Sequence, residues 1–284
     1  MDYNISEDIK AIREILSLTQ SELATKLGVQ QITISRCESG KTVASSKLLE
    51  LVYNFAFEND IELGRLKEML WKENIKKDHK LLFHGAKESF NGLISIDKSR
   101  ANNDFGKGFY AGESYVQAIS FVSAFEHSSV YYLDFDDDNL NFKKYSVDRD
   151  WMMIIAYYRG GLEAYINHPL LKRLINESRE YDYIIAPIAD NRMFQIINSF
   201  VYGEITDEQC KHCLAASNLG NQYVFISERS VKKLKPLERV YISNKEKEHY
   251  MNLKSKDAKL GEDKVKLARI KYRGKGKYID EILK

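Results

Sequence analysis

The chain has 284 residues, of which 44% are hydrophobic and 30% charged, and its formal net charge is +2. No apolar run approaches the roughly 20 residues of a transmembrane helix, and three cysteines argue against a disulfide-rich scaffold. We therefore expect a cytoplasmic protein with no membrane partner, long enough for two or more domains.

The first sixty residues predict four short helices. Apolar residues recur at helical spacing from Ile9 to Leu16. Thr19 and Glu22 form a capping box at the start of a second helix, and Gly28 favours the tight turn that ends it. QQITISRCESG and ASSKLLELVYNFAFEND predict the third and fourth helices. Two short helices joined by a glycine turn inside such a bundle are typical of a helix-turn-helix.

The segment LTQSELATKLGVQQITISRCESGK resembles the Cro/C1-type (XRE) family of helix-turn-helix domains. The matching positions are Thr19, Gln20, Ala24, Gly28, Ile34, Ser35, Glu38 and Gly40. Domains of this family lay the third helix in the major groove of DNA. The resemblance therefore implies DNA contacts from Gln20, Gln30, Gln31, Thr33, Ser35 and Arg36.

The chemistry of these side chains suits DNA. Glutamine matches the donor and acceptor of adenine, Arg36 suits a phosphate or a guanine, and Gln20 is placed for a phosphate. A homodimer is expected because this class often reads paired half-sites. Residues 1–60 carry six Lys and Arg against nine Asp and Glu, a charge of −3. This leaves open a module that binds a protein partner instead.

Residues 61–80 predict a helical connector. Ile61, Leu66, Met69 and Leu70 fall on one side of the expected helix, and its end is basic. We place the domain boundary near residue 78.

The stretch DFGKGFYAGE, residues 104–113, does not fit three familiar glycine motifs. Lys107 is followed by Gly108 rather than by the Ser or Thr of a phosphate-binding P-loop. The glycines miss the dinucleotide-binding spacing by one residue, and a strand rather than a helix is expected after them. The letters DFG lack the other kinase motifs. The remaining interpretation is a short strand whose glycines allow close approach of a ligand or of the backbone.

The flanking segments resemble the DUF3990 family, which belongs to the broader ADP-ribosyltransferase-like fold. The matching segments are FHGAKES (83–89), NNDFGKGFYAGESYVQA (102–118), Trp151 with YYRG (157–160), YDYIIAPIADNRMF (181–194) and GNQYVFIS (220–227). The resemblance implies an α+β domain with a split β core over residues 81–235. The chain would then be multidomain, with an all-α bundle first and a basic helical extension over residues 236–284.

The resemblance also implies a binding site for NAD as a substrate. By the family's motifs, His84 would bond the adenosine ribose, Gly85 would hold the nicotinamide amide, and Tyr110 would stack on the nicotinamide ring. The further residues assigned to NAD are Asp104, Gly106, Gly108, Phe109 and Arg192, the last at the pyrophosphate.

The strand NQYVF carries Gln222 where the wider fold has a glutamate. A glutamine can bond a ribose hydroxyl, but it has no negative charge and cannot act as a general base. The domain could transfer one ADP-ribose with a carboxylate supplied elsewhere, bind NAD without turnover, or bind another nucleotide. Candidate carboxylates are Asp104, Asp190 and Glu204. As a structural alternative, Asp190 and Arg192 would form an ion pair capping a helix.

No metal site is predicted. Cys210 and Cys213 have Cys-x-x-Cys spacing, but a single further cysteine remains, so we expect them on a helix surface or in a core. Residues 229–284 carry eighteen Lys and Arg against eight Asp and Glu, a charge of +10. This tail is either a solvated helical surface or a contact surface for a polyanion.

The sequence thus predicts a DNA-binding protein with an NAD-dependent ADP-ribosyltransferase domain, and by analogy with such fusions a role in toxicity or defence. The acceptor of ADP-ribose would be a protein or a nucleic acid. The alternative is a transcriptional regulator whose middle domain senses NAD or another nucleotide without turnover, and a weaker one is a pure interaction module.

Overall fold

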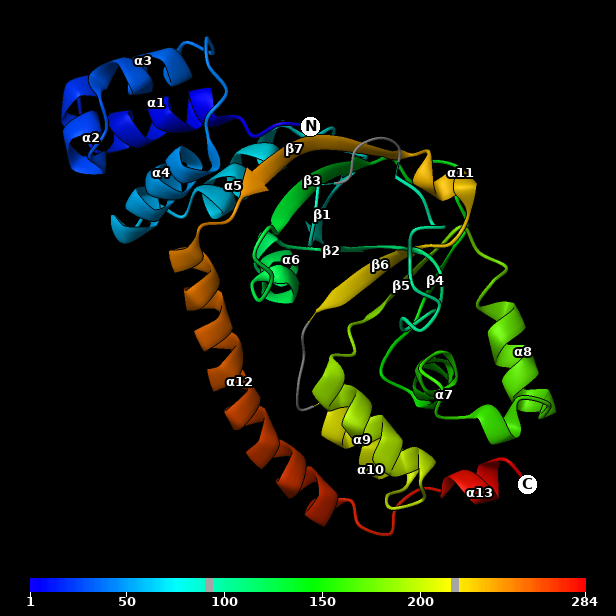
Figure 1. The fold of residues 1–284 in the computed structure, drawn as a ribbon. Helices are drawn as coiled ribbons and strands as arrows, with labels where there is room; N and C mark the ends of the chain where they lie inside the picture. The colour runs from blue at the N-terminus through cyan, green and yellow to red at the C-terminus, as the bar shows by residue number, and fades with distance from the viewer. Residues whose placement is uncertain (90–93, 216–219) are drawn as a thin grey trace. The chain divides into compact units, whose positions relative to one another are not determined.

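The structure is a computed structural model that describes residues 1–89, 94–215 and 220–284. These residues form a helical N-terminal region followed by a mixed α/β domain with a seven-stranded sheet (Figure 1). The chain divides into two compact units. The first comprises Met1–Asn91, Ser114–Phe135 and Lys235–Lys254, and the second comprises Gly92–Glu113, Asp136–Leu234 and Ser255–Lys284.

The N-terminal helices of the first unit are as predicted. They are α1 (Ile5–Ile15), α2 (Gln20–Leu27), α3 (Gln31–Glu38) and α4 (Ser46–Glu58). The backbone N–H of Glu22 donates to Thr19 Oγ1 across 3.2 Å, and Thr19 N–H donates to Glu22 Oε2 across 2.8 Å, so the capping box is formed. Gly28 ends α2 with a φ of +67°, which glycine adopts without strain. The apolar residues Leu23, Ala24, Leu27 and Ile34 of α2 and α3 are all buried.

The helix α5 (Leu63–Asn74) buries a different side from the apolar one. Leu66, Met69 and Leu70 are exposed, whereas Lys67 is buried between two carboxylates. Lys67 Nζ lies 2.6 Å from Asp8 Oδ1 and 2.5 Å from Glu238 Oε1. The ion pairs satisfy the buried ammonium, so a polar residue takes the packed position.

The first unit also holds strands β1 (Lys80–Ala86), β3 (Ser129–Phe135) and most of β7 (Leu234–Tyr241). β1 pairs antiparallel with β3, with His84 opposite Tyr131. The helix α6 (Tyr115–Val122) packs its apolar side against these strands. Residues 236–241 were expected in a helical extension, but they continue β7, where Val240 is buried in this core.

The second unit contains β2 (Phe109–Gly112), β4 (Phe142–Lys144), β5 (Tyr183–Pro187) and β6 (Asn221–Phe225). Their order is β4-β5-β6-β2. β6 pairs antiparallel with both neighbours, so that Gln222 lies opposite Gly112 on β2 and Ala186 on β5. β4 pairs in parallel with β5 at the other edge. β2 contains the predicted short strand at FYAG.

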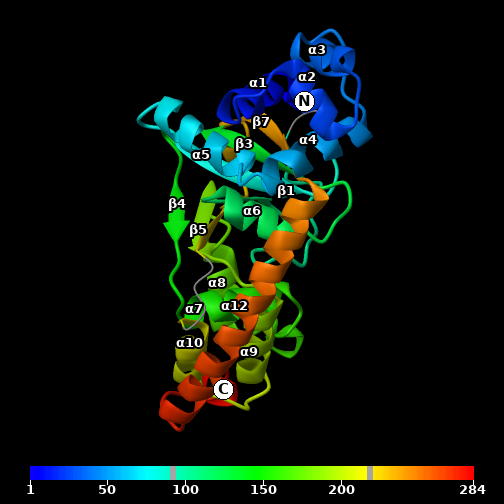
Figure 2. The same cartoon turned by 90° about the vertical axis from the view of Figure 1, so that its left-hand side faces the viewer.

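Helices pack around these strands in the second unit. They are α7 (Arg149–Tyr158), α8 (Pro169–Glu177), α9 (Asn191–Val201), α10 (Asp207–Ala215), α11 (Glu228–Val231) and α13 (Ile279–Ile282), with a 3₁₀ turn at Glu163–Tyr165. α9 and α10 lie side by side (Figure 2). Trp151, Ile197 and Phe200 lie at the centre of the core. The 28-residue α12 (Asn244–Lys271) contributes to both units.

Across the described residues, no helix combines the length and the apolar character needed to cross a membrane.

Candidate functional site

The predicted DNA-contacting residues lie on the open side of α2 and α3. Gln30, Gln31 and Arg36 are exposed, and the side chains of Gln20, Thr33 and Ser35 are partly exposed. Gln31 Nε2 donates to Gln20 Oε1 across 2.9 Å, so these two glutamines are brought together as one polar edge.

A partly buried ion pair holds this edge in place. Arg13 donates to Glu38 through Nε at 3.0 Å and through a terminal nitrogen at 2.5 Å. Gln20 Nε2 donates to the same carboxylate across 3.0 Å. Burial acts to raise the pKa of Glu38, but the hydrogen bonds from Arg13 and Gln20 outweigh it and the pKa is lowered. The glutamate therefore stays ionised, neutralised by Arg13, and fixes the direction of Gln20 and hence of Gln31.

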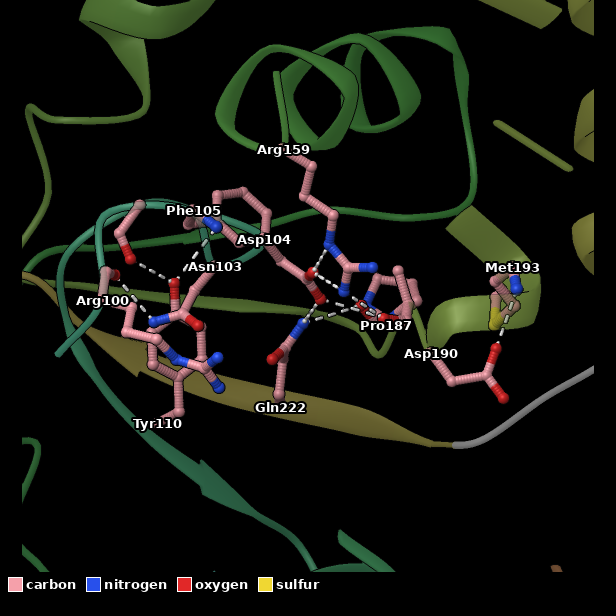
Figure 3. Close-up of polar contacts among 12 residues, drawn as sticks. Arg100, Asn103, Asp104, Phe105, Tyr110, Arg159, Pro187, Asp190, Met193 and Gln222 are labelled. Carbon is pink, nitrogen blue, oxygen red and sulfur yellow. Dashed lines mark hydrogen bonds and ion pairs between the residues drawn. The ribbon is translucent and has the colours of Figure 1, made fainter. Parts of the chain in front are cut away.

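The glycine stretch of the second unit is held to the core by Asp104 (Figure 3). Arg159 donates to Asp104 Oδ1 from Nε across 2.8 Å and also from a terminal nitrogen. Asp104 Oδ2 accepts from the backbone N–H of Ala189 at 3.3 Å and from Gln222 Nε2 at 2.8 Å. The carboxylate is 5% exposed, and its charge is compensated by a guanidinium in two-point contact.

Gln222 is the second member of this buried cluster. Its side chain comes from β6, is 8% exposed, and donates also to the carbonyl of Pro187 across 3.2 Å. Asp104 and Pro187 both accept from Nε2, which fixes the orientation of the amide. If the amide were reversed, Oε1 would face a carboxylate and a carbonyl, and all three are acceptors. The structure thus brings together Asp104 and Gln222, two of the predicted site residues.

Tyr110 reaches back from β2 to the glycine stretch. Its hydroxyl donates to Gly106 O across 2.8 Å and accepts from the backbone N–H of Phe105 at 3.1 Å. Burial raises the pKa of this phenol well above its usual range. Tyr110 therefore remains neutral and ties the strand to the loop that precedes it.

Arg179 fixes the other side of the loop. It donates to the carbonyls of Phe105 and Lys107 at 3.1 and 3.2 Å and to the hydroxyl of Tyr158 at 2.8 Å. Gly106 has a φ of +70°, and a Cβ there would lie 2.6 Å from the Arg179 guanidinium. Glycine is needed at 106 both for its dihedral angles and for this close approach.

Gly108 and Phe109 of the glycine stretch serve packing. A Cβ at Gly108 would lie 2.9 Å from the carbonyl oxygen of Phe225, so glycine lets β6 approach closely. Phe109 is buried, with its ring centroid 6.2 Å from that of Phe225.

His84 and Gly85 belong to the first unit, on β1. The imidazole of His84 is partly buried. A Cβ at Gly85 would lie 2.5 Å from the carbonyl oxygen of Ala118 on α6, so helix packing alone requires glycine there. Residues 84 and 85 thus lie in the first unit, and Tyr110 and Gln222 lie in the second.

The other candidate carboxylates stand apart from Gln222. Asp190 caps α9 by accepting the backbone N–H of Met193 at Oδ1 across 2.8 Å, and Figure 3 shows it pointing away from the Asp104 cluster. Glu204 is exposed in the turn after α9. Arg192 donates to the carbonyl of Ala258 across 2.6 Å. The helix cap expected at Asp190 is present, and the group that it binds is the backbone N–H of Met193.

Sequence reasoning missed Arg159 and Arg179 as site residues. Arg159 stands in the YYRG segment, and Arg179 has no motif signal of its own. Only the fold reveals that both guanidiniums hold the glycine stretch.

The cysteines are packing residues. Burial raises the pKa of the Cys210 thiol well above its usual range, and Cys210 and Cys213 donate to backbone carbonyls at 3.7 and 3.6 Å. Both lie in the core, one of the two predicted locations. In the part of the chain that the structure describes, no three His, Cys, Asp or Glu side chains gather as metal ligands would.

Comparison with known proteins identifies two families. A helix-turn-helix family matches residues 9–52, which supports DNA binding by the α2–α3 region. The family described as a protein of unknown function (DUF3990) matches residues 81–235, more than half of the chain. No curated protein and no solved structure gives a significant match. The chain therefore belongs to the DUF3990 family.

Proposed function

We propose that the protein binds DNA through α2 and α3 and transfers ADP-ribose from NAD through its mixed α/β domain. The observation that carries the proposal is the 2.8 Å hydrogen bond from Gln222 Nε2 to Asp104 Oδ2. The wider ADP-ribosyltransferase-like fold has a glutamate at the position of Gln222. The hydrogen bond supports a role for the carboxylate of Asp104, which would act through the glutamine.

Asp104 is a positioning residue in this proposal. Because Nε2 is engaged by Asp104 and Pro187, Gln222 Oε1 is the acceptor left for a ligand hydroxyl. Among the residues that the structure describes, none donates a hydrogen bond to Oε1. A ribose hydroxyl of NAD would donate to this oxygen, in place of the glutamate carboxylate of the wider fold.

Fixed dipoles suit the chemistry of the transfer. The bond between ribose C1′ and the nicotinamide nitrogen breaks, nicotinamide leaves with the bonding pair, and the acceptor bonds C1′ and releases a proton. Positive charge develops on the ribose ring during this step. The negative end of an amide held in one orientation stabilises such a charge without reorganising, although less than a full carboxylate would.

The test is turnover of labelled NAD with protein, RNA and DNA offered as acceptors. Gln222→Ala removes the proposed acceptor, so we expect label transfer to fall on the order of 100-fold. Asp104→Asn replaces the carboxylate that binds Nε2 with a neutral amide and so weakens the hold on the orientation of Gln222, and we expect kcat to fall while KM stays near the wild-type value. Glu228→Gln, an exposed change on α11 outside the cluster, is the matched control.

The outcomes separate three cases. Label transfer that depends on Gln222 supports a transferase and identifies the acceptor class. Release of nicotinamide without transfer supports a glycohydrolase. Intact NAD in every condition, with all acceptors present, removes the enzyme proposal.

A nucleotide sensor is the second candidate function, and the ion pair between Arg159 and Asp104 favours it. With the carboxylate neutralised and 5% exposed, the cluster carries little net negative charge toward a ligand. This candidate predicts that NAD changes the affinity of the protein for DNA while NAD stays intact. Equal DNA affinity with and without NAD would exclude it.

A further inference from the structure

A surface cleft of about 540 Å³ lies beside the glycine stretch, wholly within the second unit. Its walls include Gly106, Lys107, Tyr157, Tyr158, Glu163 and Arg179. The volume is within the roughly 300–1,000 Å³ that small-molecule sites occupy. The cleft has no assigned role, and of its lining residues only Gly106 is among those attributed above to NAD.

One wall is aromatic and rigid. The rings of Tyr157 and Tyr158, at the end of α7, meet edge to face with their centroids 5.1 Å apart. Tyr158 is held by Arg179, whose guanidinium lies 5.1 Å from its ring centroid and bonds its hydroxyl. Aromatic surface fixed in this way suits a planar ring, because stacking costs little further ordering.

The rim at the glycine stretch is cationic. Lys107 is exposed, and its ammonium makes no ion pair with any residue that the structure describes. Each of the three nitrogens of Arg179 donates one hydrogen bond, two to carbonyls of the loop and one to Tyr158. One N–H therefore remains on each terminal nitrogen. Two cations with spare donors at one rim favour an anion with several oxygens, of which phosphate is the best match.

A carboxylate completes the lining. Glu163 is exposed in the turn after α7, where Gly160 has a φ of +84° and a Cβ would lie 3.6 Å from Glu163 Oε1. An ionised carboxylate accepts hydrogen bonds and donates none, so it suits sugar hydroxyls. The same carboxylate would oppose a second anionic group placed next to it.

We propose that this cleft binds a nucleoside monophosphate unit. The base would lie against Tyr157 and Tyr158, the phosphate at Lys107 and Arg179, and the ribose hydroxyls at Glu163. Each of the three chemical parts of a nucleotide meets a complementary group. A cationic or a purely apolar ligand would leave part of this lining without a complementary group. The unit is either a free mononucleotide or the phosphorylated end of a single strand.

The proposal is tested by calorimetric titration of the full chain with AMP, adenosine and a single-stranded oligonucleotide bearing a 5′-phosphate. We expect AMP to bind and adenosine to bind about 100-fold more weakly, since the charge-assisted contacts with both Lys107 and Arg179 are lost. Lys107→Ala should weaken AMP about tenfold and leave adenosine unchanged. Tyr157→Leu should weaken both ligands.

Two variants serve as controls. Lys172→Ala removes an exposed lysine of α8 that does not line the cleft, and it should bind AMP as wild type does. Gln222→Ala should also keep AMP binding, so a failure of the transferase proposal would not affect this one.

Comparison of the titrations with AMP and with the oligonucleotide identifies the source of the nucleotide. Tighter binding of the oligonucleotide, competed by AMP, assigns the cleft to a nucleic-acid end, and binding of AMP alone assigns it to a free nucleotide. The proposal is overturned if neither ligand binds at millimolar concentration, or if Lys107→Ala and Tyr157→Leu leave AMP affinity unchanged.

Discussion

Gln222 and Asp104 are 118 residues apart in the chain, yet the amide nitrogen of one lies 2.8 Å from a carboxylate oxygen of the other. This contact gives a physical reason for a glutamine at position 222. A glutamate there would bring a second carboxylate within hydrogen-bonding distance of Asp104, with a single guanidinium to compensate both. Glutamine at 222 and aspartate at 104 are therefore a matched pair.

Gln222→Glu tests this pairing through stability. The new carboxyl lies beside Asp104, so its pKa in the folded state should rise above its unfolded value. The folded protein then holds an extra proton as the pH falls. We expect the variant to be less stable than wild type by roughly 1–3 kcal/mol at pH 8, with a smaller deficit at pH 5. Urea unfolding at both pH values measures it, and a deficit that is the same at both would contradict the pairing.

Asp104→Ala should lower the free energy of unfolding more than Gln222→Glu does, because it leaves the Arg159 guanidinium without its carboxylate. Losing one partner of a buried ion pair costs roughly 3–5 kcal/mol, and less where water reaches the partner, as it does at Arg159 with 17% of its side chain exposed. We expect a loss of about 3 kcal/mol in urea unfolding. The double variant Asp104→Ala/Arg159→Met should recover much of this loss, and strictly additive losses would show that the two residues are not coupled.

The helix-turn-helix was predictable from sequence because its signals are local. The capping box of Thr19 and Glu22 and the left-handed Gly28 act within one helical turn of the chain. Strand β1 was likewise predictable from an apolar run that ends in His-Gly. Such features depend on neighbours in sequence, which are visible without the fold.

The Asp104 cluster and the packing of α5 depend on distant residues. The register of β6 against β5 sets Gln222 beside the loop that carries Asp104, and nothing near either residue reveals this. On α5 the apolar residues Leu66 and Met69 suggested the buried side, but Lys67 is buried instead. Its partners Asp8 and Glu238 lie far away in the sequence, so the ion pairs that permit its burial could not be read from the helix alone.

The contact between Gln20 and Gln31 predicts unequal effects on DNA binding. Gln31, on the recognition helix, can reach a base edge, whereas Gln20 orients it. With a duplex selected from a random pool by the wild-type protein, Gln31→Ala should raise Kd about tenfold or more and relax sequence preference. Gln20→Ala should raise Kd less. Gln195→Ala, on the exposed side of α9, is the control, and equal Kd values for all four proteins would rule out this binding edge.

Glu246 predicts a pH dependence of stability in the first unit. Burial raises the pKa of this carboxyl to about 7, while a hydrogen bond from the hydroxyl of Tyr115 acts against the rise and the nearby Glu62 adds to it. Since the folded pKa is above the unfolded value, the folded state binds more protons than the unfolded state between about pH 4.5 and 7. In this window the contribution of Glu246 to the unfolding free energy rises as the pH falls, by roughly 1 kcal/mol per pH unit.

Glu246→Gln removes the titrating group and keeps an oxygen that can accept the Tyr115 hydroxyl. We expect the variant to be more stable than wild type at pH 8, where the buried carboxylate is ionised, and the two proteins to converge toward pH 5. Urea unfolding across this range gives the difference directly. Glu248→Gln, an exposed neighbour on α12, should follow wild type at every pH. A constant offset between Glu246→Gln and wild type would mean that the carboxyl does not titrate in this range.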